Sequence, residues 1–213
     1  MKAWSLKSSL GQGYADLYPY YHPSNEILCS ECNRKAPVNY MKAHWEEGSD
    51  QIGDFTSATG LLAIKKTVLN LILQHFKGLE SFPINFISNP RYKRSTKSRP
   101  LISFPYQGPE LVEIRAFYEI PLHSDSSVEI EECCKKCNRV TYKKFVGIEE
   151  KNSSKHRKRI PGMGFFFNAE DRNDYDFFKP KDTGFILCTD DVKNFIIRKK
   201  FTNIDFLEVG EFV

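Results

Sequence analysis

The spacing of hydrophobic residues predicts two short helices, each set between strands. Across Lys65–Lys77, apolar side chains recur every three or four positions, and Gly78 is expected to end that helix. Near the C-terminus, Val192 and two further apolar residues at the same spacing predict a second helix, with Thr189 and Asp190 as candidates for its N-cap. The pattern therefore predicts one or two helices packed against a sheet.

Shorter apolar or alternating runs predict the strands. We expect strands around Phe55, Ile84–Ile87, Leu111–Ile120, Phe185–Cys188 and Ile204–Val209. The third of these runs alternates only in part, so both of its faces could be covered. Together the elements predict an α+β fold, with one compact domain over residues 1–213 and an antiparallel sheet packed by one or two helices.

The two predicted helices lie in similar segments. The run that begins at Gly60 and the run that begins at Gly184 both read as strand, helix and strand, and both helices contain Val-x-Asn. This likeness suggests a pseudo-repeat of strand–helix–strand units near residues 55–87 and 184–209. Chance similarity between two ordinary elements explains it equally well.

Composition narrows the class of protein. The chain has 213 residues, of which 40% are hydrophobic and 27% charged, enough apolar residues for a large core and too many for a disordered chain. The net charge of +4 is too small for a nucleic-acid coat protein. Apolar runs such as Leu61–Ile64 are far shorter than the roughly 20 residues of a membrane span, and the N-terminus does not read as a signal peptide. We therefore expect a cytoplasmic protein with no membrane partner.

The cysteines carry the most specific chemistry in the sequence. Cys29 and Cys32 form one Cys-x-x-Cys pair, Cys134 and Cys137 form a second, and an asparagine follows each pair. Such a turn presents two thiolates to one ion, so two turns can supply the four ligands of a tetrahedral zinc site. Asparagine tolerates the left-handed conformation in which backbone N–H groups can point at sulfur. The sequence thus predicts a zinc-ribbon-like site for one structural zinc ion per chain, with knuckles at 29–32 and 134–137.

Alternatives to this ligand set remain open. Some 101 residues separate Cys32 from Cys134, against roughly 15–20 in a compact zinc ribbon, although the cost of closing a loop grows only slowly with its length. Cys133 could replace Cys134, and His22 or His123 could replace a cysteine. The thiols could also be free, or form a redox pair, but neither pair follows the apolar strand that is typical of redox motifs.

A resemblance to a known family rests on these pairs and on the C-terminal unit. Two distant Cys-x-x-Cys pairs, followed by strand, short helix and the hydrophobic-Asp-Phe-x-Glu run at 204–208, resemble the bacterial double-CXXCG motif proteins. The similarity extends over the run from Gly60 to Phe76, the segment Ile120-Pro-Leu-His123 and the stretch from Phe185 to Leu207. Asn33 and Asn138 depart from the family pattern, which has glycine after each pair.

The resemblance implies a non-enzymatic cytoplasmic protein. Members of that family include immunity proteins for toxins that myxobacteria exchange between kin cells. The chain is therefore expected to bind and neutralise a cognate protein toxin. The resemblance also implies metal-ligand roles for Cys29, Cys32, Cys134 and Cys137, and no catalytic residue. It does not indicate the toxin, the interface residues or the oligomeric state.

Two basic loops suggest an alternative function. Lysine and arginine cluster at 91–99 and at 155–159, and aromatic residues follow the second cluster at Phe165–Phe167. Zinc knuckles with basic loops and aromatic side chains occur in nucleic-acid-binding proteins, so a zinc-ribbon nucleic-acid-binding regulator is the alternative. Solvated loop tips, or docking to an acidic protein, explain the same charges. Phosphate-binding, nucleophile-elbow and zinc-protease motifs are absent from the sequence, so no enzymatic reaction is predicted.

Overall fold

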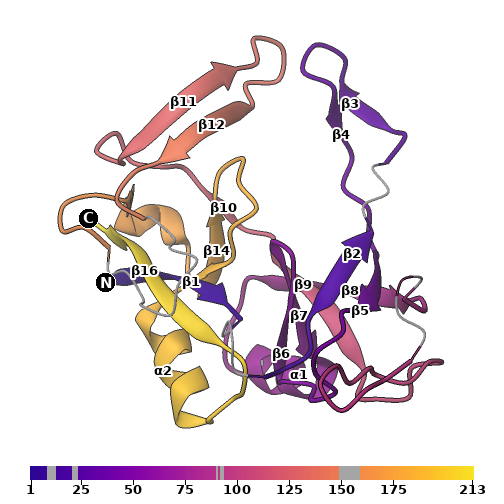
Figure 1. The fold of residues 1–213 in the computed structure, drawn as a ribbon. Helices are drawn as coiled ribbons and strands as arrows, with labels where there is room; N and C mark the ends of the chain where they lie inside the picture. The colour runs from indigo at the N-terminus through magenta and orange to yellow at the C-terminus, as the bar shows by residue number, and fades with distance from the viewer. Residues whose placement is uncertain (9–12, 21–23, 90, 92–93, 149–158) are drawn as a thin grey trace.

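The computed structural model describes residues 1–8, 13–20, 24–89, 91, 94–148 and 159–213. Over these residues the fold is mostly sheet with two α-helices (Figure 1). Among them, no helix is long and apolar enough to cross a membrane. The helices are α1 (Lys66–Leu73) and α2 (Asp190–Arg198), and a 3-10 turn covers Ala169–Arg172.

The strands follow one another along the chain with few long gaps. They are β1 (Lys2–Lys7), β2 (Leu17–Tyr20), β3 (Ile27–Cys29), β4 (Arg34–Lys35), β5 (Met41–Trp45), β6 (Phe55–Ala58), β7 (Leu61–Lys65), β8 (Leu79–Phe86), β9 (Leu111–Ala116), β10 (Glu119–Ile120), β11 (Val128–Cys133), β12 (Val140–Phe145), β13 (Phe165–Phe167), β14 (Phe177–Pro180), β15 (Leu187–Cys188) and β16 (Asp205–Phe212).

In the described part of the chain, these strands form two six-stranded sheets and two separate two-stranded hairpins. The first sheet, here the N-sheet, has the order β2-β5-β8-β9-β7-β6, and the second, the C-sheet, has the order β10-β14-β15-β1-β16-β13. The predicted sheet was antiparallel, but both sheets are mixed, since β5 pairs with β8, β13 with β16 and β10 with β14 in parallel. Each parallel pair joins strands that are separated in the chain by several other elements, because parallel neighbours need a long crossover connection.

Each half of the chain gives one strand to the sheet of the other half. The N-terminal half (β1–β8 with α1) forms the N-sheet, except that its β1 lies in the C-sheet, antiparallel to both β15 and β16. Conversely, β9 of the C-terminal half (β9–β16 with α2) lies in the N-sheet, antiparallel to both β7 and β8. Each strand–helix–strand unit therefore encloses a strand that comes from the other half.

Most of the other pairings correspond between the halves. The hairpins β6–β7 and β14–β15 are antiparallel, the pairs β5–β8 and β13–β16 are parallel, and the isolated hairpins β3–β4 and β11–β12 are antiparallel. The halves differ at β2, which pairs with β5, and β10, which pairs with β14. The pseudo-repeat expected from sequence near 55–87 and 184–209 stays a hypothesis about origin, but these segments share one topology.

A shared hydrophobic core joins the halves. Both helices contribute to one buried cluster, together with Phe55 and Phe177, which are the first apolar residues of β6 and β14 and are fully buried. Smaller clusters cover the outer faces of the sheets, one under β13 and β16 and one under β5. Helix α1 ends at Leu73, earlier than predicted, and Gly78 lies directly before β8 instead of capping the helix. A Cβ at Gly78 would collide with the carbonyl oxygen of Phe177, so this glycine permits close contact between the halves.

Reciprocal hydrogen bonds fix the start of β6 and of β14 to the opposite half. The Asp54 carboxylate accepts from the backbone N–H of Thr202 at 2.9 Å and from its hydroxyl at 3.0 Å, and Lys65 donates to it at 3.1 Å. In the same way, the Asp176 carboxylate accepts from the backbone N–H of Lys77 at 3.0 Å. Each aspartate thus accepts a hydrogen bond from a backbone N–H group in the loop that follows the helix of the other half.

Replacement of Asp54 tests this contact. Burial raises the pKa of Asp54, but the backbone N–H and hydroxyl of Thr202 and the ammonium of Lys65 outweigh it, so the net pKa lies below 3.8. The stabilisation is therefore present above pH 3.8 and is lost as the pH falls through the folded-state pKa. We predict that Asp54→Asn lowers the free energy of unfolding at pH 7 by about 1–3 kcal/mol. The variant loses the ion pair with Lys65, and the NH₂ group of the asparagine amide cannot accept a hydrogen bond from Thr202.

Urea unfolding at pH 7 and at pH 3 measures this difference. The deficit of Asp54→Asn should shrink at pH 3, whereas the exposed Asp50→Asn should match the parent at both values. A deficit that does not depend on pH would contradict the assigned role of the carboxylate.

Candidate metal centre

Two β-hairpins carry the four predicted ligands. Figure 1 shows β3–β4 and β11–β12 rising from different halves of the molecule and converging at their tips. Cys29 ends β3 and the turn to β4 holds Cys32, while Cys134 and Cys137 lie in the turn between β11 and β12. Neither hairpin is bonded into a six-stranded sheet, so each is an arm with a cysteine pair at its end.

The turns adopt the backbone conformation that the sequence predicts. Asn33 has φ of 52° and Asn138 has φ of 55°, so both residues after the cysteine pairs are left-handed. The backbone N–H of Asn138 donates to the carbonyl oxygen of Cys134 at 2.8 Å, which closes the second turn. The prediction that asparagine replaces the usual glycine in this conformation is confirmed.

The four sulfur atoms form one cluster. Cys29 Sγ lies 3.8 Å from Cys134 Sγ, and Cys32 Sγ lies 3.6 Å from Cys137 Sγ. All four ligand atoms lie within 4.8 Å of one another, and none of the four cysteines is in a disulfide. Each close pair joins one cysteine of the first arm to its counterpart in the second. The cluster is positioned to hold a metal ion between the two arms.

Electrostatics favour a cation at the centre of the cluster. Backbone N–H groups of Cys32 and Glu31 lower the pKa of the Cys29 thiol to about 6, so one thiolate forms readily. For Cys137, the backbone N–H of Arg139 acts in the same direction, but burial and the neighbouring thiols prevail and raise its pKa to about 12. Further negative charge is therefore costly unless a positive ion compensates it.

The alternative ligands lie outside the cluster. Cys133 is exposed at the end of β11, whereas Cys134 is buried with the other sulfur atoms. His123 contacts Asp125, with its Nδ1 accepting from the Asp125 backbone N–H at 3.3 Å, and it is not a member of the group. His22 lies outside the described residues. The sequence left the choice between Cys133 and Cys134 open, and the geometry favours Cys134.

The two basic loops are only partly free to meet a ligand. In the loop at 91–99, Arg99 contacts Glu47 at 3.2 Å, while Arg91 and Arg94 are exposed. Lys155, Arg157 and Lys158 of the second loop lie outside the described residues.

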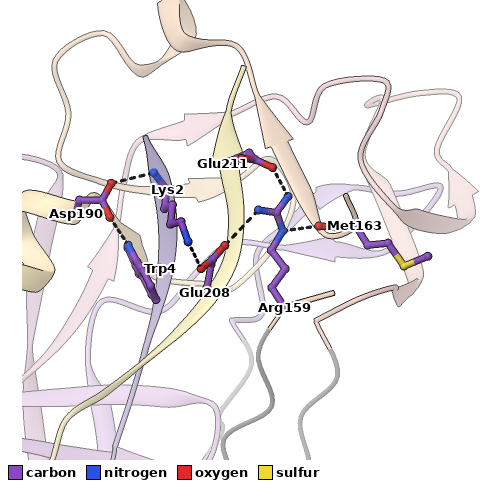
Figure 2. Close-up of polar contacts among 7 residues, drawn as sticks. All are labelled: Lys2, Trp4, Arg159, Met163, Asp190, Glu208 and Glu211. Carbon is purple, nitrogen blue, oxygen red and sulfur yellow. Dashed lines mark hydrogen bonds and ion pairs between the residues drawn. The ribbon is translucent and has the colours of Figure 1, made fainter. Parts of the chain in front are cut away.

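Arg159, the last basic residue of the second loop, is buried and forms its contacts within the protein. It is 8% exposed and donates to the carbonyl oxygen of Met163 (Figure 2). The same guanidinium contacts Glu211 at 2.7 Å and Glu208 at 3.5 Å (Figure 2). The basic loop predicted at 155–159 therefore loses Arg159 as a contact for phosphate.

The same network attaches the N-terminal strand to helix α2 and to β16. Asp190 was a candidate N-cap, but its carboxylate instead accepts from the Lys2 backbone N–H at 2.9 Å and from Trp4 Nε1 at 2.8 Å. The Lys2 ammonium contacts Glu208 at 2.6 Å (Figure 2). These contacts hold β1 in the C-sheet.

Sequence reasoning missed one buried charge pair. Glu113, on β9, is fully buried, and Arg115 donates to both of its carboxylate oxygens, from Nε at 2.6 Å and from Nη2 at 3.0 Å. The signal was visible as two opposite charges, two positions apart, in an otherwise apolar strand. It is a local signal, since both residues belong to the same face of one strand.

Comparison with known proteins adds no assignment. No family model matches the chain, and no curated protein is significantly similar to it.

Substitution of single cysteines tests the cluster. We predict that Cys134→Ser loses most of the bound metal, because three thiolates and a hydroxyl form a much weaker site, and that it lowers the melting temperature. Cys133→Ser, one residue away and exposed, is the matched control and should retain about one metal ion per chain. Elemental analysis of the dialysed proteins measures both, and retention by Cys134→Ser with loss by Cys133→Ser would reverse the ligand choice.

Proposed function

We propose that the cluster of Cys29, Cys32, Cys134 and Cys137 holds one structural zinc ion. Four soft thiolates in a tetrahedron are a typical donor set for zinc. With zinc–sulfur bonds of about 2.3 Å, the sulfur atoms of such a tetrahedron lie about 3.8 Å apart. The distances of 3.8 and 3.6 Å between the paired sulfur atoms fit that geometry.

The role of the ion follows from where the ligands come from. Two thiolates belong to each arm, and the arms belong to different halves, so a bound ion cross-links residues more than a hundred positions apart. Four protein ligands complete a tetrahedral shell, which supports a structural and not a catalytic role. The ion would stabilise the folded state, because metal binding energy in such sites contributes directly to folding.

We further propose that the protein is an immunity-type protein that binds and neutralises a cognate bacterial toxin in the cytoplasm. The observation that carries this proposal is the pair of distant cysteine turns brought into one closed cluster. This arrangement accords with the resemblance to double-CXXCG motif proteins. The mechanism is occlusion, in which a preformed surface covers the toxin's active site or a surface that the toxin needs. A clamp between the arms favours such binding, since a preordered surface loses little entropy on association.

A survival assay with a physical readout tests the immunity proposal. The tagged protein is purified from its native host, and the bound proteins are identified by mass spectrometry. We expect one stoichiometric protein partner, and cells that express this partner should survive only when the full-length chain is co-expressed. The Cys133→Ser variant should protect as well as the parent, and Cys134→Ser should protect less because it folds less stably.

The same preparation distinguishes the immunity proposal from the alternative, nucleic-acid binding. Nucleic acid in the eluate, seen as a raised ratio of absorbance at 260 and 280 nm and removed by salt, would favour the zinc-ribbon regulator. Absence of a protein partner and absence of protection would overturn the immunity proposal.

Metal identity is a separate prediction. The purified protein should contain about one zinc ion per chain and lack the visible absorption of an iron–thiolate centre. A strong chelator should lower the melting temperature, and added zinc should restore it, because the metal binds the folded state preferentially. A chain that contains iron, or that melts at the same temperature without metal, would contradict the structural zinc.

A further inference from the structure

A second candidate site lies at the base of the first arm. A cavity of about 410 Å³ is bounded by the segment after β4, by β9, and by residues 183–186 ahead of β15. It therefore uses both halves of the chain, but none of the four clustered cysteines. Its volume falls within the range of roughly 300–1,000 Å³ that is usual for sites of small organic ligands.

The cavity combines apolar walls with four charged residues, Lys35, Glu113, Arg115 and Lys179. Side chains such as Val38, Met41 and Phe185 form much of the wall. Arg115 also lines it, with its side chain 24% exposed, while its partner Glu113 is fully buried. The Arg115 guanidinium lies over the ring of Phe82, with its Cζ 4.3 Å from the ring centre. Phe82 and Glu113 thus fix the position of the guanidinium.

The fixed guanidinium retains donor capacity. Arginine has five N–H donors, and Glu113 engages Nε and one N–H of Nη2. Within the described part of the chain, the Nη1 nitrogen has no hydrogen-bond acceptor. Lys35 and Lys179 also line the cavity, and Lys179 contacts Glu119 at 3.1 Å. The charged lining is therefore predominantly basic.

The equivalent place in the other half has different chemistry. Glu113 pairs with Ala63 on β7, and Ser5 pairs with Leu187 on β15, so strands β9 and β1 occupy matching positions in their sheets. Ser5 and Lys7 then stand where the other sheet has Glu113 and Arg115. A second cavity of about 450 Å³ is lined by Ser5 and Lys7.

The fold therefore does not require the charge pair. Burial of a carboxylate costs desolvation energy even when it is paired, so a pair present in one half alone is weak evidence for a role in stability.

We propose that this cavity binds a small apolar molecule that carries one carboxylate group. The apolar part lies against Val38, Met41 and Phe185, and the carboxylate accepts hydrogen bonds from the free N–H groups of Arg115. Glu113 is a positioning residue, which holds the guanidinium without contacting the ligand. The site is independent of the proposed metal and of the proposed toxin.

The test uses the full-length, metal-loaded protein and two probes of equal chain length. Isothermal titration calorimetry measures binding of octanoate and of octanol. Octanoate should bind at least about tenfold more tightly, because a charge-assisted hydrogen bond to a fixed guanidinium distinguishes the two. Equal affinity for the two probes, or no binding of octanoate at millimolar concentration, would overturn the proposal.

Two variants show where the probe binds. The double variant Glu113→Gln, Arg115→Met removes both charges at similar side-chain volume and should abolish the preference for octanoate. Gly184→Phe adds bulk beside the cavity, because a Cβ at Gly184 meets no atom within 4 Å and its φ needs no glycine. This variant should lower the affinity for both probes. It tests the location of the site even if the double variant does not fold.

Gln51→Phe, at an exposed position that does not line the cavity, is the matched control for added aromatic bulk. It should bind octanoate as the parent does. Unchanged octanoate affinity in a folded double variant and in Gly184→Phe would place the binding elsewhere and reject the site.

Discussion

The exchange of β1 and β9 between the halves is the constraint on which the rest of the structure depends. Each strand lies in the interior of a sheet otherwise built by the other half, so neither sheet is complete without both parts of the chain. The exchange also contributes to the shared core, because apolar residues of β1 and β9 are buried in one cluster with residues of both helices. The contacts of Asp54 and Asp176 with the opposite half then follow from the same arrangement.

The arms join the two halves at a place outside the six-stranded sheets of the described chain. A two-stranded hairpin has little stability in water by itself, and most of β11 is exposed, so hydrophobic burial does little to fix the arms. The four thiols bring the ends of both arms together where no sheet does. A core formed by exchanged strands and a cluster of four cysteines between the arms are thus two different ways of joining the same two halves, one apolar and central, the other polar and peripheral.

The sequence predicted local features better than their arrangement. The cysteine turns, the left-handed asparagines and both helices were predicted because spacing and conformational preference are encoded within a few residues. The expected antiparallel sheet is two mixed sheets in which most pairings are antiparallel, and Leu111–Ile120 was expected as one strand but divides into β9 and β10. Strand exchange and the burial of Arg159 depend on contacts between distant residues, for which hydrophobic periodicity carries no information.

The position of β1 also affects how the chain can fold during its synthesis. Its partners β15 and β16 lie about 180 to 210 residues later in the sequence. At translation speeds of roughly 5–20 residues per second, β1 stays without its native neighbours for on the order of 10 to 40 seconds. The N-sheet similarly awaits β9 at its centre. The nascent chain therefore exposes unpaired strand edges for most of its time on the ribosome. The same exposure is expected for any fold in which each half contributes one strand to the sheet of the other half.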